Sequence, residues 1–179
     1  LPNLKKLKLY FLIGVPGETE SDVEEIAATA RDVQIRTGWE VTVSVTPMIP
    51  KPFTPMQWAP FAADVELKRK RELLRERLAG NKRIRLKVES LRAAREQAVL
   101  SRGDRRLGAV LLEAADDPGN SLLKLMRARG IDPDFYSSRP RGEKEVFPWD
   151  TMSHGTDRAT LYKDYVKSVE AAGADNERD

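Results

Sequence analysis

The sequence contains no cysteine and one histidine among its 179 residues. Without cysteine there is no disulfide framework, and these residues lack the thiolates that usually hold iron–sulfur clusters. His154 stands between Ser153 and Gly155 in an expected loop, with no further metal ligand beside it. We therefore predict no catalytic residue and no metal ligand in this chain.

Long apolar runs, internal repeats and low-complexity segments are also lacking. No apolar run approaches the roughly 20 residues that a membrane-spanning helix needs, and residues 1–14 lack the small-residue cleavage site of a signal peptide. The hydrophobic content of 40% is adequate for a core. We therefore expect a cytoplasmic protein without a membrane partner, large enough for one domain or somewhat more.

The N-terminal third has the pattern of strand, glycine-rich turn, helix and strand. Residues 7–13 form a mostly apolar run, typical of a parallel strand covered on both faces. Residues 14–17 (GVPG) allow a ligand close to the backbone, or form a plain tight turn. Thr19 and Asp22 have capping-box spacing, and Gly38 is placed to end the helix that follows.

The expected second strand has one apolar and one polar face. Valines alternate there with the hydroxyl side chains of Thr42, Ser44 and Thr46. Two strands joined by a crossover helix are expected to pair in parallel. If the hydroxyl face points into a barrel, it can hydrogen-bond a polar cofactor or substrate; the alternative is a strand with one wet face.

Prolines interleaved with aromatic residues follow the second strand. Residues 47–61 are expected to be stiff and extended, and neither helix nor inner strand. Lys51, Gln57 and Trp58 are candidates for substrate contact. The alternative is that the aromatic side chains fix the loop to the core.

The remaining chain is predicted to be mainly helical and locally basic. Between residues 66 and 106, fifteen Lys and Arg face six Asp and Glu, although the whole chain carries only +3. A basic strand with Arg83, Arg85 and Lys87 could follow an RNA backbone. The alternative is a solvated helix face with pairs such as Glu66 with Lys70. We expect the strand at 83–89 and helices at 64–80, 91–100, 105–115, 121–129 and 158–171.

Four segments, in order along the chain, resemble radical S-adenosylmethionine (SAM) enzymes. Residues 11–19 (FLIGVPGET) resemble the fifth-strand segment of these enzymes, and residues 46–55 (TPMIPKPFTP) resemble the exit from their sixth strand. Residues 98–107 (AVLSRGDRRL) and 147–150 (FPWD) are similar to the C-terminal region of uncharacterised radical SAM proteins with an N-terminal cobalamin-binding-like domain.

The resemblance implies an α/β fold. Residues 1–61 would form the C-terminal strands of a partial (β/α)6 radical SAM barrel, and residues 62–179 a basic, mainly helical α+β extension. Within the extension, Asp104 is expected to cap a helix and Trp149 to be buried in a docking segment.

The resemblance also implies which residues contact the cofactor. In the family, the backbone of the matching strand and turn lies against the adenosyl part of SAM, and the sixth-strand exit supplies apolar contacts to adenine. Carried onto this sequence, the SAM-contacting positions are Leu12, Ile13, Gly14, Glu18, Thr46 and Met48.

The chain departs from the family at the iron–sulfur cluster. Family members hold a [4Fe-4S] cluster with three cysteines, typically C-x3-C-x2-C, and this sequence has none. The resemblance therefore implies that a missing N-terminal part of the same polypeptide holds the cluster, with cobalamin as a further candidate cofactor and RNA as a candidate substrate. This chain alone is then expected to be inactive. The alternative is a non-catalytic basic module that binds RNA or a ribonucleoprotein.

Overall fold

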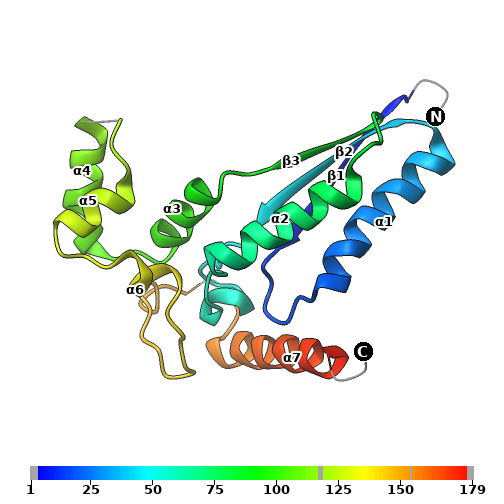
Figure 1. Ribbon diagram of the computed structural model, residues 1–179. Coiled ribbons are helices and arrows are strands. Elements are labelled where there is room, and N and C mark those ends of the chain that lie inside the picture. Colours follow the sequence, from blue (N-terminus) through cyan, green and yellow to red (C-terminus); the bar gives the residue numbers. More distant parts are fainter. Residues whose placement is uncertain (1–3, 117–118, 154, 177–179) are drawn as a thin grey trace. The chain divides into compact units, whose positions relative to one another are not determined.

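The computed structural model describes residues 4–116, 119–153 and 155–176, so His154 lies outside the described residues. Within them the chain forms two compact units, here called unit 1 and unit 2 and coloured along the chain in Figure 1. The expected boundary after residue 61 is one of several points where the chain passes between the units. Unit 1 comprises 4–48, 62–91 and 172–176, and unit 2 comprises the described residues of 49–61 and 92–171.

Unit 1 contains a parallel sheet of three strands, β1 (Lys6–Ile13), β2 (Glu40–Pro47) and β3 (Ile84–Val88), in the order β1-β2-β3. The expected partial (β/α)6 barrel is wrong, because the described strands form a small open sheet. A barrel closes only when its first and last strands can pair. Here β1 and β3 lie at opposite edges, with β2 between them.

Helix α1 (Glu20–Thr37) begins and ends where the sequence predicts. The Thr19 hydroxyl accepts from the Asp22 N–H, and the Asp22 carboxylate accepts from the Thr19 N–H, which completes the capping box. Gly38 ends the helix with φ 68° and donates its N–H to the Gln34 carbonyl. This φ is strained for residues with a Cβ, so glycine suits the position.

Helices α1 and α2 (Asp64–Leu78) lie on the same side of the sheet, as Figure 1 shows. Successive right-handed crossovers in a sheet of this strand order place both helices on one face. The valines of β2 point toward the helices and are buried. Strand β1 is therefore covered on one face rather than both, and Tyr10 and Leu12 on its other face are 71% and 55% exposed.

Unit 2 is helical. The expected helix at 105–115 begins as a 3-10 turn, η2, and continues as α4. The expected helices at 91–100 and 121–129 form with small shifts at their ends, and the one expected at 158–171 extends to Asn176. The described elements that lie in it wholly or largely are η1 (Pro55–Trp58), α3 (Leu91–Ser101), η2 (Arg105–Leu107), α4 (Gly108–Asp116), α5 (Leu122–Ala128), α6 (Pro133–Ser137) and α7 (Arg158–Asn176).

Two short helices of unit 2 depart from the sequence prediction. The proline-rich segment contains η1, although it was expected to exclude helix, and α6 lies outside the helices expected from the sequence. Both begin with proline, at Pro55 and Pro133. The first helical position tolerates proline because its N–H has no intrahelical acceptor.

Two apolar clusters stabilise unit 2. One surrounds Met126 and Val110 and joins α3, α4 and α5 with Tyr136 of α6. The other surrounds Trp58 and includes Phe147, Trp149 and Leu161. Trp58 packs edge-on against Phe147, with ring centroids 5.6 Å apart. No helix within the described ranges is both long and apolar enough to cross a membrane.

Candidate functional site

The turn between β1 and α1 is a hydrogen-bonded reverse turn. The Glu18 N–H donates to the Val15 carbonyl at 3.0 Å, and Gly17 has φ 81°. Proline second and left-handed glycine third is the type II pattern. A shallow cavity of about 270 Å³ beside the turn is lined by Val15, Pro16, Gly17, Glu18 and Asp22.

Gly14 is fixed by packing against α2. Its φ is 77°, and an added Cβ would lie 2.8 Å from the Leu67 Cδ2 and 2.9 Å from the Ala62 Cβ. Its N–H donates to the Glu18 carboxylate at 2.7 Å. The close approach that the glycine permits is therefore to α2, and its N–H is already paired.

A buried ion pair holds the turn to α2. The Lys70 Nζ lies 2.7 Å from Glu18 Oε2 and 2.5 Å from Glu66 Oε1, and the side chains of Lys70 and Glu18 are only 5% and 8% exposed. Burial alone would lower the pKa of Lys70, but hydrogen bonds and attraction from Glu18 and Glu66 raise its pKa overall. Glu18, a predicted SAM contact, therefore has a structural role here.

The sheet face away from the helices is polar. Thr42, Ser44 and Thr46 are half-buried on it, and Leu12 pairs with Thr46 in the sheet register. The hydroxyl face predicted from sequence is therefore present, as a wet face of an open sheet.

The other two predicted contacts of this region point elsewhere. The Ile13 side chain is fully buried and Met48 is 6% exposed, and the Met48 N–H donates to the Ile13 carbonyl at 2.8 Å. Of the six predicted SAM contacts, the register brings Leu12 and Thr46 together on the open face, where both retain accessible surface.

Cationic side chains from β1 and β3 border the hydroxyls. Arg85 pairs in register with Thr42, and Lys87 with Ser44, and both are exposed. Lys8 of β1 lies 4.4 Å above the Tyr10 ring. Arg83 instead donates to the Gly38 carbonyl at 2.5 Å, so it ties the start of β3 to the end of α1.

The basic excess on α2 is largely paired within unit 1. Arg77 Nη2 lies 2.5 Å from Glu24 Oε1 of α1, and Arg69 pairs with Glu20. The predicted pair of Glu66 with Lys70 is confirmed. The charge that sequence reasoning found concentrated is therefore balanced in part by acids of the preceding helix.

Lys51, Gln57 and Trp58 lie in unit 2. Trp58 is fully buried in the aromatic cluster, and Gln57 accepts from the Trp149 Nε1–H at 2.8 Å. Lys51 is exposed and donates to the Ser101 hydroxyl at 2.9 Å. The burial predicted for Trp149 is confirmed, with 5% exposure.

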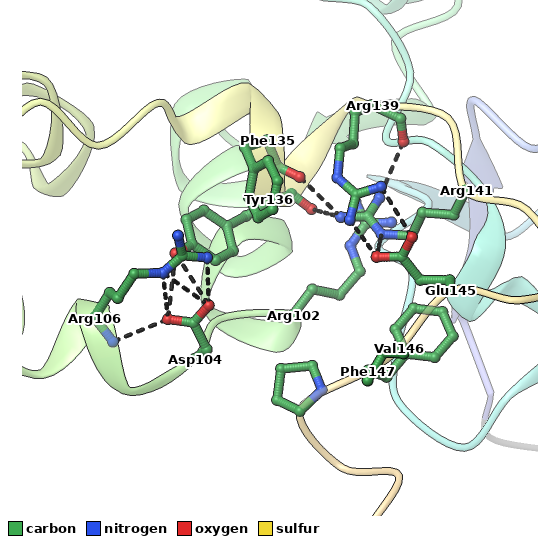
Figure 2. A pocket seen from close by; sticks show the side chains of 11 residues that line it. Arg102, Asp104, Arg106, Phe135, Tyr136, Arg139, Arg141, Glu145, Val146 and Phe147 are labelled. Atoms are coloured by element: carbon green, nitrogen blue, oxygen red, sulfur yellow. Dashed lines mark hydrogen bonds and ion pairs between the residues drawn. The ribbon is translucent and has the colours of Figure 1, made fainter.

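Unit 2 contains a cluster of arginines that was not predicted from the sequence. Arg102, Arg139, Arg141 and Glu145 line a cavity of about 260 Å³, shown in Figure 2, and Arg139 and Arg141 pair with Glu145. Asp104 accepts from the Arg106 N–H at 2.9 Å and caps η2, as predicted, and hydrogen bonds from Arg106 lower the pKa of Asp104. The arginine-rich segment 102–106 was visible in the sequence as a signal for this site, but its distant partners Arg139, Arg141 and Glu145 were not.

This chain is similar to an uncharacterized protein from Methanocaldococcus jannaschii. The two are 34% identical over 131 residues, a match that covers 72% of this chain and 28% of that relative. The chain therefore spans less than a third of the length of the relative. No protein family model and no solved structure matches it.

Within the described residues, no group of three or more His, Asp or Glu side chains is placed to hold a metal ion. The donor set for a [4Fe-4S] cluster is likewise not present, since the sequence has no thiolate. These residues therefore do not fit the cluster that the resemblance implies.

Proposed function

We propose that the open sheet face of unit 1 binds SAM as part of a radical SAM enzyme. The observation that supports this is the pairing of Leu12 with Thr46 at the carboxyl ends of β1 and β2, in line with Ser44 and Thr42. Ligands of open parallel sheets bind outside the carboxyl ends of the strands. The segment resemblance adds the identity of the ligand.

The residues on this face suit the adenosyl part of SAM. The Leu12 side chain offers an apolar surface to an adenine ring, and the Thr46 and Ser44 hydroxyls can exchange hydrogen bonds with ribose hydroxyls. The protein's part in such a reaction is to bind and orient the cofactor and to exclude water. Glu18 and Lys70 act indirectly, because they position the end of β1.

The cluster belongs to another part of the protein in this proposal. When bound, a [4Fe-4S] cluster supplies the electron for reductive cleavage of SAM. The residues of this chain do not fit the cluster, because they include no thiolate. Cobalamin is a candidate cofactor only because of the sequence resemblance.

A titration of SAM into this chain, followed by backbone NMR shifts, tests the proposal. We expect saturable shifts at the ends of β1 and β2, weakened by Thr46→Val and by Leu12→Lys. Thr151→Val, an exposed hydroxyl of unit 2, is the matched control and should leave them unchanged. Shifts that are absent, or that survive both substitutions in unit 1, would contradict SAM binding at this face.

RNA binding is a second candidate, favoured by the exposed cations on the same face. In the sheet register, Arg85 of β3 lies beside Thr42 of β2, and Lys87 lies beside Ser44. Neutralising phosphates with such side chains gives affinity that falls steeply with salt. Within this hypothesis Arg83 contributes less, because its guanidinium donates to a backbone carbonyl.

The RNA hypothesis has its own test. The double variant Arg85→Gln/Lys87→Gln should weaken binding of single-stranded RNA and reduce the salt dependence by about two counterions. The matched control, Lys163→Gln/Lys167→Gln, removes two exposed cations from α7 of unit 2. Equal losses in both double variants would show non-specific charge attraction and would count against a binding face on the sheet.

A further inference from the structure

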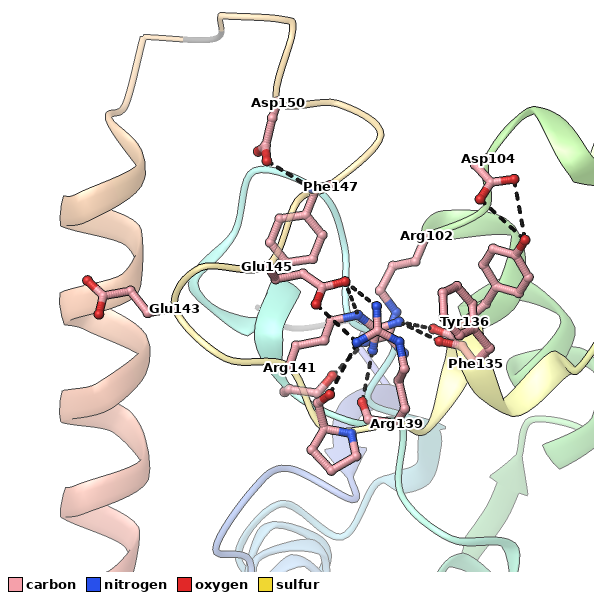
Figure 3. A network of polar contacts seen from close by, with 12 residues as sticks. Arg102, Asp104, Phe135, Tyr136, Arg139, Arg141, Glu143, Glu145, Phe147 and Asp150 are labelled. Atoms are coloured by element: carbon pink, nitrogen blue, oxygen red, sulfur yellow. Dashed lines mark hydrogen bonds and ion pairs between the residues drawn. The ribbon is translucent and has the colours of Figure 1, made fainter.

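Two guanidinium groups in unit 2 share the Glu145 carboxylate, and a third, that of Arg102, lines the same cavity. Arg139 binds Glu145 through both terminal nitrogens, with Nη1 3.0 Å from Oε2, and Arg141 Nε lies 3.9 Å from the same carboxylate. Arg102 reaches the cluster from the end of α3, as Figure 3 shows. The cluster therefore has an excess of positive charge.

The other charged groups of the cavity do not correct this excess. Asp104 and Arg106 neutralise each other, with Arg106 Nη2 2.6 Å from Asp104 Oδ2. The Tyr136 hydroxyl donates to Asp104 at 3.3 Å. The walls thus hold four arginines and two acidic side chains.

Two of the arginines are deeply buried. Arg102 is 3% exposed, and its guanidinium donates to the carbonyls of Ala59, at 2.6 Å, and Ser137. The Arg141 side chain is 3% exposed and donates to backbone carbonyls, including that of Tyr136 at 2.7 Å. These bonds satisfy the Ala59 carbonyl after η1 and carbonyls at the end of α6, but they bring no negative charge.

Burial and uncompensated positive charge lower the pKa values of Arg102 and Arg141. Burial, together with repulsion from Arg141 and Arg139, lowers the pKa of Arg102 to about 9. Burial and repulsion from Arg139 lower the pKa of Arg141 to about 10. The charged form of each of these two arginines is therefore less stable here than that of an exposed arginine.

Hydrogen-bond donors also remain unused in the cluster. The Nε–H groups of Arg102 and Arg139 are buried without an acceptor. Binding to carbonyls explains why Arg102 and Arg141 are present. It does not explain the buried Nε–H donors of Arg102 and Arg139 or the surplus positive charge. An anionic ligand would supply acceptors and charge together.

We propose that this cavity binds a phosphate monoester. Arginine is suited to phosphate because its planar fork donates to two oxygens at once. The surplus of two positive charges matches a phosphate dianion, and a volume of about 260 Å³ leaves room for part of the esterified group. Phe135, Tyr136 and Phe147 in the wall give that group an apolar and aromatic surface.

Calorimetric titration of the full chain with inorganic phosphate tests the site, at constant ionic strength. Saturable binding is expected, with chloride and acetate unable to replace phosphate. Arg139→Gln should weaken it by roughly tenfold or more, as expected when a charged hydrogen-bond donor is removed. Arg127→Gln, an exposed arginine on α5, is the matched control and should not change it.

Glu145→Gln gives the opposite and more discriminating result. Removing the internal carboxylate frees Arg139 and Arg141, so phosphate should bind more tightly than to the unchanged protein. Thermal unfolding of each variant establishes that it is folded. Absence of saturable phosphate binding, tighter binding of acetate than of phosphate, or identical affinity in Arg139→Gln and Glu145→Gln would overturn the proposal.

Discussion

The β1–α1 turn depends on the buried ammonium group of Lys70, which pairs with Glu18. Lys70→Met should lower the free energy of unfolding by about 3–5 kcal/mol, because it leaves the Glu18 carboxylate buried without its cation. Urea denaturation measures this. Lys68→Met, an exposed lysine on the same helix, should change stability by less than about 0.5 kcal/mol.

The double variant Lys70→Met/Glu18→Gln separates charge from packing. It removes both charges, so it should recover much of the stability lost in Lys70→Met alone. A double variant as unstable as the single one would mean that the loss came from packing of the lysine chain.

The same pair predicts a pH dependence. In the folded protein the pKa of Lys70 is raised above its ordinary 10.5, with Glu18 and Glu66 facing it. A raised basic pKa gives stability that is complete below pH 10.5 and is lost as the pH rises through the folded value. The urea midpoint should therefore fall in that range, and Lys70→Met should remove this part of the fall.

Two glycines give opposite expectations for substitution by alanine. Gly14→Ala should destabilise by about 1–3 kcal/mol, because its φ is positive and the new Cβ would clash with Leu67. Gly108→Ala should be neutral or stabilise by up to about 1 kcal/mol, since Gly108 has helical angles and open space. Thermal unfolding of both variants tests the pair, and equal shifts would contradict the strain argument.

At the scale of elements, α1 owes its start to the capping box. Thr19→Ala should cost about 1 kcal/mol because the first turn loses an acceptor for its N–H groups. Thr19→Ser keeps the acceptor and should retain most of the stability. Hydrogen exchange at the Asp22 amide reports the cap directly, and unchanged protection in Thr19→Ala would refute its role.

Elements with local signals were predictable from the sequence. The capping pair Thr19 and Asp22 and the left-handed Gly38 fix α1, and the alternation along β2 identifies its polar face. The strands of the open sheet were mispredicted as barrel strands. The local sequence pattern identifies a strand, but it does not show whether the edge strands β1 and β3 pair with further strands. A short helix such as α6 has too few residues to show periodicity.

The arginine cluster was also beyond local pattern. Arg102 meets Arg139, Arg141 and Glu145 from more than 35 positions away, and only the folded chain brings them together. The SAM prediction rested on segment resemblance. The structure separates its residues into a pair on the open sheet face, exposed Leu12 and half-buried Thr46, and others that are buried or paired.

At the scale of the whole molecule, β1 offers an exposed edge and an exposed apolar pair. Among described residues it pairs on one side only, and Tyr10 and Leu12 are accessible. Such strands favour association between copies. Tyr10→Lys/Leu12→Lys should reduce concentration-dependent association in sedimentation, whereas Val65→Lys, at an equally exposed position of α2, should not.

The order in which the chain builds its two units limits how the protein can be dissected. It passes between them after residues 48, 61, 91 and 171, so each unit is assembled from separated stretches. No single proteolytic cut can release either unit intact. A truncation after residue 61 leaves Gln57 and Trp58 on one fragment and Trp149 and Phe147, their partners, on the other. Recombining such fragments, rather than studying one alone, is the way to regain the aromatic cluster.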